Sequence, residues 1–403
     1  MVLSHPATPL QYRYSMNAVE LAERFQKQFK SQAQVFSAPG RVNLIGEHTD
    51  YNDGFVLPSA IGFFTQAAIS PRSDQKLVIR STEFEGSFEV DVTTLPAHKQ
   101  GAWCDYIIGV AKELVRSGCR LGGADLLIHG EVPIGAGLSS SAALEVVAAL
   151  ALLSLTQCEI SPKEIARLCQ RAENEFIGAR VGIMDQFVSC FGREGNAVLL
   201  DCRSLGFELV PIPGSVKLVI CNTMVKHEHA GGEYNQRRRE CEQGVEVLSK
   251  SYPGISALRD VSLEQLMAKK ADMPPVVYKR CLHVVEENAR VLSAAREFRK
   301  GNLSAVGELM RESHVSMRDL YEISCRELDI MVEAAEGLSG YYGGRMTGGG
   351  FGGCTVNLVE SAHSSNFRDK IAERYRARTG ISPEIYICSP ADGAHAEAMV
   401  SAR

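Results

Sequence analysis

A run of glycines and serines at residues 133–142 is the segment of the chain best suited to hold phosphate. It reads Pro-Ile-Gly-Ala-Gly-Leu-Ser-Ser-Ser-Ala and leads directly into an apolar stretch. Small residues let the backbone approach a ligand closely, and a helix N-terminus offers free N–H groups and a partial positive charge. The serine hydroxyls could bind phosphate oxygens or place one oxygen on Mg²⁺. Taken alone, the segment is equally well explained as an ordinary helix N-cap behind a flexible loop.

A polar run at residues 40–52 is the second candidate for chemistry. It places Arg41, Glu47, His48 and Asp50 within ten residues, between segments that predict strands. A polyol suits such side chains, because each carboxylate accepts hydrogen bonds from two hydroxyls and an imidazole can donate or accept. A metal site is disfavoured, because the run lacks a second histidine at helical spacing. A solvated loop is the alternative interpretation.

Asp185 is the third candidate, because it stands inside an apolar run. A buried aspartate normally needs a partner or a function. Glu173 precedes it by twelve residues, on a neighbouring predicted helix. From this segment alone, a structural role for Asp185 as a helix N-cap is slightly favoured over a catalytic one.

Two further motifs resemble other nucleotide-binding classes but fail on their context. Residues 348–353 contain a GxGxxG pattern, yet a strand is predicted to follow it, whereas a dinucleotide-binding fold needs a helix there. Residues 317–320 superficially resemble a protein-kinase catalytic loop, but the histidine is absent and Ser324 stands where an asparagine belongs.

The elements that must position these residues follow from periodicity and turn signals. Asn17 and Glu20 form a capping box that predicts a helix start. The other expected elements are extended segments over 35–94, a strand at 124–128, helices at 141–155, 162–175 and 182–189, a strand at 216–221, a largely helical region over 233–336, and strands at 354–358 and 384–388 flanking a helix at 367–379.

This mixture of strands and helices predicts an α+β protein with two domains, residues 1–210 and 211–403. The proline-rich segment 203–215 is the expected junction. The C-terminal end of the chain could return to the first domain.

Composition excludes several classes of protein. The chain has 403 residues, 45% hydrophobic and 23% charged, with a formal net charge of −5. It is therefore neither disordered nor a typical nucleic-acid binder, and we expect the basic cluster at residues 237–239 to be a solvated helix face. The longest apolar stretch, residues 146–153, is too short to span a membrane.

The twelve cysteines are scattered, with no paired spacing that would suggest zinc. Residues 1–17 show no secretion signal, so we expect a cytoplasmic protein whose cysteines are all reduced.

Together these motifs resemble the galactokinase family of the GHMP small-molecule kinases. Residues 40–54 (GRVNLIGEHTDYNDG) are similar to the family's N-terminal signature, 132–143 to its phosphate-binding motif, 182–186 to its catalytic-aspartate segment and 346–354 (MTGGGFGGC) to its third motif. Glu233, Tyr234 and Asn235, with the arginines and Cys241 that follow, are similar to a further family stretch. The order and spacing agree from about residue 38 to about residue 389.

The resemblance implies a two-domain fold with the active site in the cleft between the domains, and an ATP-dependent enzyme that phosphorylates the anomeric hydroxyl of α-D-galactose. This is the first committed step of galactose metabolism, the Leloir pathway. It implies that Asp185 is the catalytic base, with Arg41 beside it to hold it ionised and to stabilise the transferring phosphoryl group. Ser141 and Glu173 would hold Mg²⁺ against the phosphates of ATP.

The resemblance also assigns binding residues. Sugar contacts are expected from Glu47, His48, Thr49, Asp50, Gly182 and Tyr234. ATP contacts are expected from Gly135, Ala136, Gly137, Leu138, Ser139, Ser140, Ser141, Gly348 and Gly349, with Trp103 and Tyr106 near the adenine. The implied partners are D-galactose and MgATP, with no nucleic acid and no membrane, and we expect a monomer or a weak homo-oligomer.

Two departures from the family pattern remove no proposed catalytic group, and the second bears on sugar choice because it could loosen the loop that carries Tyr234. Val181 stands where a cysteine is common, and Gly231 and Gly232 stand where serines are usual. Kinases for galacturonate, N-acetylgalactosamine or arabinose therefore remain alternatives within the enzyme class. A sensor of galactose and ATP without catalysis is the alternative from another class, disfavoured because the serine loop and Asp185 are intact.

Overall fold

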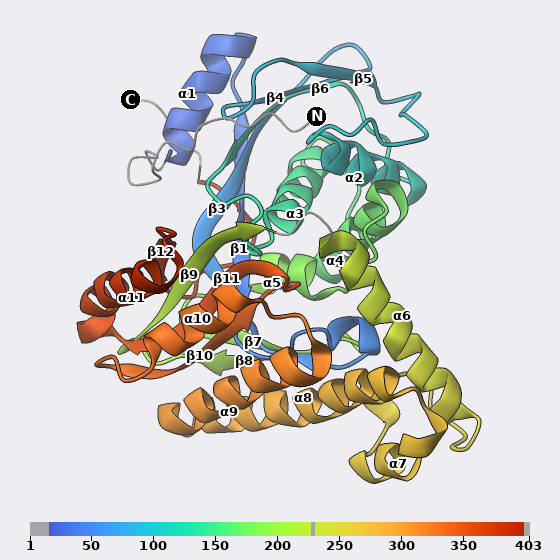
Figure 1. Cartoon of the computed structure of the whole chain (residues 1–403). Helices are drawn as coiled ribbons and strands as arrows, with labels where there is room; N and C mark the ends of the chain where they lie inside the picture. Colours follow the sequence, from blue (N-terminus) through green and yellow to red (C-terminus); the bar gives the residue numbers. More distant parts are fainter. Residues whose placement is uncertain (1–15, 227–229, 399–403) are drawn as a thin grey trace.

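The computed structural model describes residues 16–226 and 230–398, and its largest sheet forms one half of the molecule (Figure 1). This sheet has six strands in the order β13-β1-β3-β6-β4-β5. Their bounds are β1 Gln34–Asn43, β3 Pro58–Pro71, β4 Lys76–Ser81, β5 Phe88–Asp91, β6 Ala124–Gly130 and β13 His395–Ala396. The β4–β6 pair is parallel, and the other pairs are antiparallel.

Helices cover this sheet and supply its core. α1 (Ala18–Phe29) opens with the predicted capping box of Asn17 and Glu20. The other helices of this half are α2 Asp105–Arg116, α3 Ser140–Leu153, α4 Pro162–Arg171 and α5 Met184–Phe191. α3 is buried around most of its circumference, and its alanines and valines pack with Ile69 and Leu126 of the sheet. A helix apolar on all sides belongs in a core, and this one brings the serine loop to its N-terminus.

The second half contains a four-stranded sheet in the order β10-β11-β9-β12. Its strands are β9 Val216–Lys226, β10 Tyr341–Thr347, β11 Gly352–Glu360 and β12 Glu384–Cys388. The helices are α6 Ala230–Ser249, α7 Leu263–Ala268, α8 Pro275–Arg299, α9 Leu303–Ser316, α10 Arg326–Ala335 and α11 Ser364–Thr379. The predicted strand–helix–strand order at the C-terminal end is confirmed, whereas β10 was not predicted.

One strand pairing links the C-terminal end of the chain to the first half of the fold. β13, near the C-terminal end, pairs with β1, so the expected return of the chain to the first part of the fold is confirmed. The predicted junction, residues 203–215, contains β8 (Phe207–Pro211), which pairs with β7 (Asn196–Asp201) beside β2 (Phe55–Val56). The proline at its end predicted a loop, but Pro211 is tolerated because β8 lies at the edge of this three-stranded sheet.

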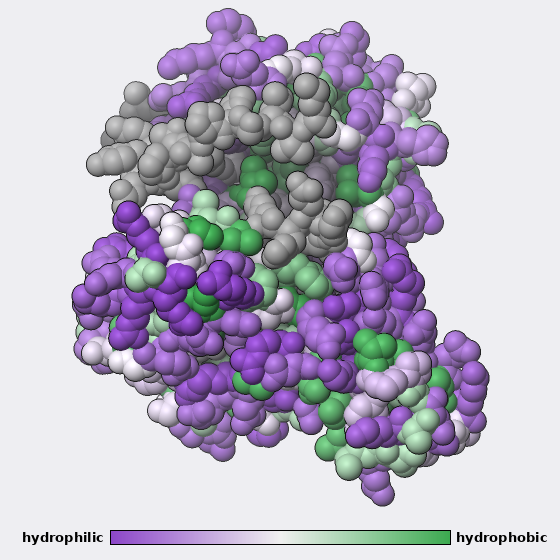
Figure 2. Space-filling view, in the orientation of Figure 1, coloured by the Kyte–Doolittle hydropathy of each residue, from purple (hydrophilic) through white to green (hydrophobic). Residues whose placement is uncertain are grey.

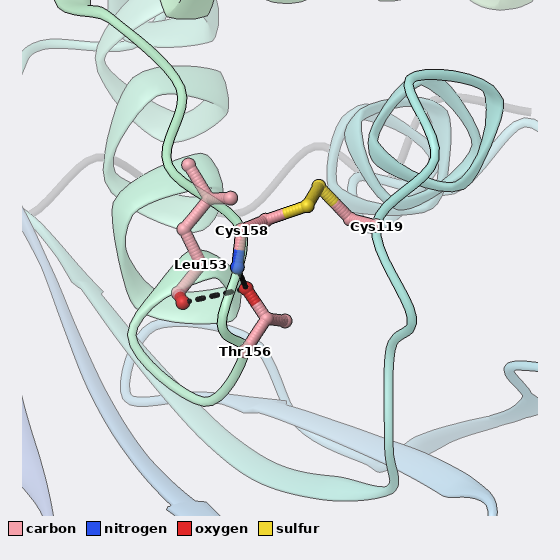
Figure 3. The surroundings of a disulfide bond; sticks show 4 residues. All are labelled: Cys119, Leu153, Thr156 and Cys158. Atoms are coloured by element: carbon pink, nitrogen blue, oxygen red, sulfur yellow. Dashed lines mark hydrogen bonds between the residues drawn. A yellow bond between two sulfur atoms is a disulfide. The ribbon is translucent and has the colours of Figure 1, made fainter.

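A disulfide between Cys119 and Cys158 corrects the expectation that all cysteines are reduced (Figure 3). Cys119 follows α2 and Cys158 lies between α3 and α4, with Cα atoms 5.6 Å apart. The two cysteines are brought together by the tertiary packing of these connections. The spacing of cysteines in the sequence does not reveal such packing. The other ten cysteines are free and mostly buried.

The basic cluster on α6 also differs from the prediction of a solvated face. Arg237 is buried and donates to the carbonyl oxygens of Tyr321 and Glu322, both at 2.8 Å. These carbonyls lie at the C-terminal end of the π-helical segment Met317–Tyr321, which follows α9. Carbonyl groups at a helix end have no N–H partner within the helix, and Arg237 supplies one. Only Arg239 is exposed as expected.

The face seen in Figure 2 is mostly hydrophilic. Hydrophobic side chains emerge near α7 and α8, where Leu263, Met267 and Val276 are exposed. Within residues 16–226 and 230–398, no helix is long and apolar enough to cross a membrane.

Candidate active site

A cavity of about 300 Å³ lies where segments from both halves of the chain meet. The end of β1, the loop before α3 and the start of α5 line it from one half, and α6 and the loop after β10 line it from the other. Most of the predicted site residues line it: Arg41, Glu47, His48, Asp50, Gly135, Gly137, Leu138, Ser139, Ser140, Ser141, Glu173, Gly182, Asp185, Tyr234, Gly348 and Gly349. Val181 and Met184 complete the lining.

Asp185 and Arg41 form an ion pair through two parallel hydrogen bonds. Arg41 donates from Nε to Oδ1 and from Nη2 to Oδ2, both at 2.8 Å, and Ser139 donates to Oδ2 at 2.5 Å. A carboxylate has about four acceptor sites. Arg41 Nη2 also lies 2.7 Å from Oδ1, so each oxygen has two close donor atoms and a ligand has to share or displace one of them. The side chain of Asp185 is 27% exposed, whereas Arg41 is buried beneath it.

The structure removes the N-cap interpretation of Asp185. Ile183 occupies the N-cap position of α5, and Asp185 lies in the first turn of that helix with its carboxylate turned toward Arg41. Arg41 reaches it from β1, just after a register shift between Pro39 and Arg41. Such an irregularity re-aims side chains at the end of a strand.

The loop before α3 is shaped by Arg41 as well as by its glycines. Arg41 donates from Nη1 to the carbonyl of Gly137 at 2.7 Å and from its backbone N–H to Leu138 at 3.0 Å. Ser139 is the N-cap residue, in the left-handed region at φ 61°, and its hydroxyl bonds to Asp185 instead of capping the helix. The first N–H groups of α3 are therefore left without a side-chain cap and can accept an anion.

A buried acidic pair lies beside this N-terminus. Glu173 lies in the π-helical segment Ala172–Ile177, and Gln186 donates from Nε2 both to Glu173 at 2.7 Å and to Glu145 at 3.0 Å. Burial, with Asp185 nearby, raises the pKa of Glu173 to about 7, and burial beside Glu173 raises that of Glu145 well above its usual range. Sequence reasoning missed Glu145 and Gln186, because both stand in apolar helical runs without a motif.

The donor set around Ser141 and Glu173 fits Mg²⁺. Ser141 hydrogen-bonds to Glu173, so its hydroxyl and this carboxylate converge. Among residues 16–226 and 230–398 there is no group of three or more histidines, cysteines or acids able to hold a metal. Mg²⁺ commonly binds through one or two protein oxygens and completes its shell with water and substrate phosphates. The Ser141 hydroxyl and the Glu173 carboxylate could supply the protein oxygens, and phosphates bound at the neighbouring N-terminus of α3 could supply others.

Asp50 and Gly182 are in direct contact on the other side of Asp185. A Cβ at position 182 would lie 1.8 Å from Asp50 Oδ2, so the carboxylate would have to move to admit it. Burial and the neighbouring charge of Asp185 raise the pKa of Asp50 to about 7. Among the described residues no arginine or lysine forms an ion pair with Asp50, so a hydroxyl ligand could supply hydrogen bonds to this carboxyl group.

His48 and Tyr234 form the aromatic wall of this part of the cavity. Their ring centroids lie 5.0 Å apart, and His48 lies in the left-handed region at φ 60°. Burial lowers the pKa of His48 to about 3, so the imidazole is neutral at physiological pH.

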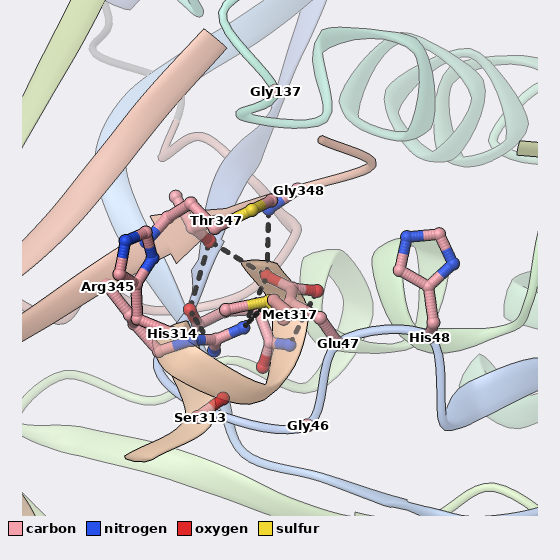
Figure 4. A network of polar contacts seen from close by, with 12 residues as sticks. Gly46, Glu47, His48, Gly137, Ser313, His314, Met317, Arg345, Thr347 and Gly348 are labelled. Carbon is pink, nitrogen blue, oxygen red and sulfur yellow. Dashed lines mark hydrogen bonds and ion pairs between the residues drawn. The ribbon is translucent and has the colours of Figure 1, made fainter. Parts of the chain in front are cut away.

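Glu47 ties the polar run to the glycine loop after β10 (Figure 4). Its Oε1 accepts from the backbone N–H of Gly348 at 2.8 Å and from Thr347 at 3.1 Å, and its Oε2 accepts from Asn43 at 2.9 Å. The fully buried Arg345 lies 3.4 Å from Oε1. Most of the acceptor capacity of Glu47 is thus used inside the protein. The sequence analysis missed Arg345, which lies in β10.

Comparisons with known proteins match this arrangement. A family model described as the galactokinase galactose-binding signature matches residues 23–71, and models of the GHMP kinase N-terminal and C-terminal domains match 105–193 and 294–377. The chain is 46% identical over 377 residues to a galactokinase of Roseiflexus sp. (strain RS-1), covering 93% of this chain and 96% of that protein. The chain belongs to the galactokinase family. It is accordingly an ATP-dependent kinase of the GHMP class.

Solved structures agree with this galactokinase membership. Lactococcus lactis galactokinase, in a crystal structure with galactose, superposes with a TM-score of 0.90 at 35% identity, covering 94% of this chain and 99% of that one. Methanococcus jannaschii mevalonate kinase has a TM-score of 0.62 at 18% identity, with 90% and 100% of the two chains covered, and shows the fold alone. The predicted α+β GHMP kinase fold is confirmed.

Four of the residues assigned from the galactokinase resemblance lie outside the cavity lining. Thr49 is buried and does not line the cavity, and its hydroxyl lies within hydrogen-bond distance of the carbonyl oxygens of Gly46 and Phe55, at 2.9 and 2.7 Å. The hydroxyl is used to close the turn of the polar run. Ala136 is also buried, at 1% exposure, beneath the serine loop.

Neither aromatic residue expected near the adenine lines the cavity. Trp103 stacks on Phe84, which is exposed, at 5.7 Å between ring centroids. Burial raises the pKa of Tyr106 to about 12, and the nearby Glu173 adds to this shift. Tyr106 is therefore a neighbour of the proposed metal ligand.

Proposed function

We propose that the protein transfers the γ-phosphoryl group of ATP to the anomeric hydroxyl of α-D-galactose, giving α-D-galactose 1-phosphate and ADP. The observation that carries this proposal is the Asp185–Arg41–Ser139 cluster. It lies between a helix N-terminus suited to phosphate and a polar wall suited to a sugar. Phosphoryl transfer passes through a loose transition state, so positioning and charge neutralisation supply most of the catalysis.

Asp185 receives the sugar hydroxyl in this proposal. The carboxylate, whose side chain is 27% exposed, takes a hydrogen bond from the anomeric hydroxyl and accepts its proton as the phosphoryl group is transferred. Arg41 contacts both carboxylate oxygens, which fixes the direction of the carboxylate. Its guanidinium also lies next to the loop that would hold the transferring group and offsets negative charge there.

The phosphates of ATP would lie against the N-terminus of α3 and residues 135–141, with Gly348 and Gly349 on the opposite side. Ser141 and Glu173 would hold Mg²⁺, which when bound neutralises phosphate charge. Glu173, with a pKa of about 7 in the free protein, must release its proton before it can act as this ligand. The adenine would extend toward Tyr106 and Trp103.

The sugar would lie against Asp50, Tyr234, His48 and the one open acceptor site of Glu47. The absence of a Cβ at Gly182 leaves room for the Asp50 carboxylate beside its backbone. Discrimination between galactose and glucose would come from hydrogen bonding, because a misplaced hydroxyl leaves buried polar groups unpaired.

The geometry of the cavity supports the alternative functions less well than galactose phosphorylation. Galacturonate would need an additional cation, and Arg41, the only arginine or lysine among the described lining residues, is already paired with Asp185. A sensor without catalysis would not need the two-point pairing of Asp185. Activity assays are needed to distinguish N-acetylgalactosamine and arabinose from galactose as substrates.

A sugar panel tests the proposal. We expect ATP- and Mg²⁺-dependent ADP release with kcat/KM highest for galactose among galactose, glucose, galacturonate, N-acetylgalactosamine and arabinose. A higher kcat/KM for another sugar would support the phosphoryl-transfer chemistry but contradict the assignment of Asp50 and Tyr234 to galactose binding. ATP binding with no ADP release for any of the sugars would favour the sensor.

A further inference from the structure

The connection between β1 and β2, residues 44–54, carries three side chains that line the sugar end of the cavity: Glu47, His48 and Asp50. A backbone hydrogen bond closes the base of this connection, where the N–H of Leu44 donates to the carbonyl of Leu57 at 3.1 Å. Gly46 and Phe55 lie in contact just beyond this base, since a Cβ at Gly46 would lie 2.8 Å from the Phe55 carbonyl oxygen. Their backbone groups do not pair with each other, so other partners must satisfy them.

The N–H groups of Gly46 and Phe55 are bound by two consecutive residues of α8. Glu287 Oε1 accepts from Gly46 at 2.9 Å, and Asn288 Oδ1 accepts from Phe55 at 2.9 Å. The carbonyl oxygens of the same two residues lie 2.9 and 2.7 Å from the hydroxyl of Thr49. Side chains therefore satisfy all four polar backbone groups of this pair. The two N–H groups depend on α8, and a buried N–H that loses its acceptor is costly.

The contact with α8 extends along one face of that helix. His283, Glu287 and Val291 are spaced four residues apart and therefore form one row on its surface. His283 Nε2 lies 3.2 Å from the carbonyl oxygen of Glu47, and a Cβ at Gly46 would lie 2.8 Å from Val291 Cγ2. Gly46 has φ 104°, a conformation that side chains with a Cβ rarely adopt. The row thus packs directly against the backbone of Gly46 and Glu47.

Glu287 is itself held on all sides. It is fully buried, its Oε1 also accepts from Ser313 of α9 at 2.6 Å, and its Oε2 accepts from Arg290 at 2.7 Å. Burial alone would raise its pKa, but the charge of Arg290, with His283 and Arg345 adding to it, lowers this pKa to about 2. Glu287 is therefore an ionised carboxylate that can only accept hydrogen bonds. Such charge-assisted bonds are stronger than bonds between neutral groups.

We propose that Glu287 and Asn288 are positioning residues for galactose binding, which hold the two ends of the β1–β2 connection and so fix the sugar-binding side chains between them. Neither residue lines the cavity, so each acts through this connection. The connection follows β1 of the first half of the molecule, whereas α8 belongs to the second half. The inference rests on the proposed function, because it takes the sugar to bind the side chains of this connection.

Hydrogen–deuterium exchange, followed by mass spectrometry, tests the holding without any sugar. In Asn288→Ala the acceptor for Phe55 is lost, and we expect a peptide covering residues 44–56 to exchange about fivefold faster than in wild type. A peptide covering residues 133–142 should exchange at the wild-type rate, which also shows that the variant is folded. Asn288→Asp keeps an oxygen acceptor for the same N–H, so its exchange over residues 44–56 should stay close to that of wild type.

Steady-state kinetics with galactose test the consequence for binding. Asn288→Ala should raise the galactose KM about fivefold, and Asn288→Asp should restore it. Glu287→Gln should raise it about tenfold, because the new amide N–H must face either Gly46 or Arg290, which are both donors. The kcat and the KM for ATP should stay within about twofold of wild type, since the catalytic pair and residues 133–142 are untouched.

Asn357→Ala is the matched control. Asn357 is also buried, and its Nδ2 donates to the carbonyl of Val219 at 3.0 Å between β11 and β9, outside the cavity lining. This variant should lower the melting temperature without changing the exchange of residues 44–56 or the galactose KM.

The proposal is overturned if either the exchange of residues 44–56 or the galactose KM in Asn288→Ala stays within about twofold of wild type. It is also overturned if the KM for ATP rises as much as that for galactose, because a general loss of structure would do this. Wild-type turnover on galactose, measured in the same series, separates these outcomes from failure of the proposed function.

Discussion

The phosphate end of the cavity is built largely from backbone, whereas its sugar end is built from side chains that other side chains hold. At the phosphate end, the uncapped N–H groups of α3 and the glycines of two loops face the cavity. At the sugar end, Glu47 is held by Arg345 and Thr347, and His48 by Tyr51. A backbone site tolerates changes around it, but a site made of supported side chains depends on every support.

The two aspartates of the cavity show the same contrast. Asp185 has Arg41 on both oxygens, while Asp50 is paired with no cation among the described residues and has a pKa raised to about 7. The first arrangement suits a group that must stay in one place during chemistry. The second suits a group whose hydrogen-bond partner arrives with the substrate.

Removing the catalytic carboxylate should have the largest effect. Asp185→Asn keeps the shape but removes the proton acceptor, and we expect kcat to fall by about 10³-fold or more. ATP binding, measured by calorimetry, should change little because the N-terminus of α3 is untouched. A variant with near-normal turnover would show that Asp185 only orients the hydroxyl.

Filling the contact between Gly182 and Asp50 should disturb the sugar end alone. The Cβ of Gly182→Ala would displace the Asp50 carboxylate, and we expect the galactose KM to rise by roughly 10- to 100-fold, as for the loss of one or two hydrogen bonds to a charged group. Gly214→Ala is the control, because a Cβ there meets nothing within 4 Å. An equal rise in the KM for ATP would argue against two separable ends.

Breaking the support of the proposed metal ligand should have an intermediate effect. In Gln186→Met, Glu173 and Glu145 lose the amide that bridges them. We expect the Mg²⁺ concentration for half-maximal rate to rise about tenfold, a usual cost of losing a partner of a metal ligand. Glu145→Gln, which mimics the protonated acid, should shift it less than twofold. A large shift in Glu145→Gln would mean that Glu145 works as a charged group.

The raised pKa of Asp50 predicts a smaller, pH-dependent change in stability. Because its pKa is raised from 3.8 to about 7 on folding, its stabilising contribution is complete below pH 3.8 and is lost as the pH rises through about 7. Without ligands, Asp50→Asn should therefore melt a few degrees above wild type at pH 8. That advantage should disappear near pH 4. The same difference in melting temperature at both pH values would contradict the assignment.

The sequence predicted the phosphate end better than the sugar end, for a physical reason. Residues 133–142 are contiguous, and their glycines, serines and following helix together determine the site. Three supports of the sugar end lie far from the polar run in the chain: Arg345, Tyr321, whose hydroxyl lies 2.8 Å from that of Tyr51, and His283, whose Nε2 lies 3.2 Å from the carbonyl oxygen of Glu47. They meet it only through packing of β10, α8 and the segment after α9, which residue spacing cannot express.

Local signals also decided which elements were predicted correctly. The capping box before α1 and the strand–helix–strand order of β11, α11 and β12 were readable, since each depends on near neighbours. The disulfide of Cys119 with Cys158 and the burial of Arg237 were not, since each depends on a partner distant in sequence.

The central claim is that this cavity transfers phosphate to the anomeric oxygen of galactose. Phosphorus NMR of galactose, ATP, Mg²⁺ and the protein tests it most directly, because coupling of the new phosphorus signal to a sugar proton identifies the oxygen that was phosphorylated. We predict a single phosphomonoester coupled to the anomeric proton in the α configuration. A signal from a 6-phosphate, or inorganic phosphate alone, would contradict the placement of the sugar against Asp185.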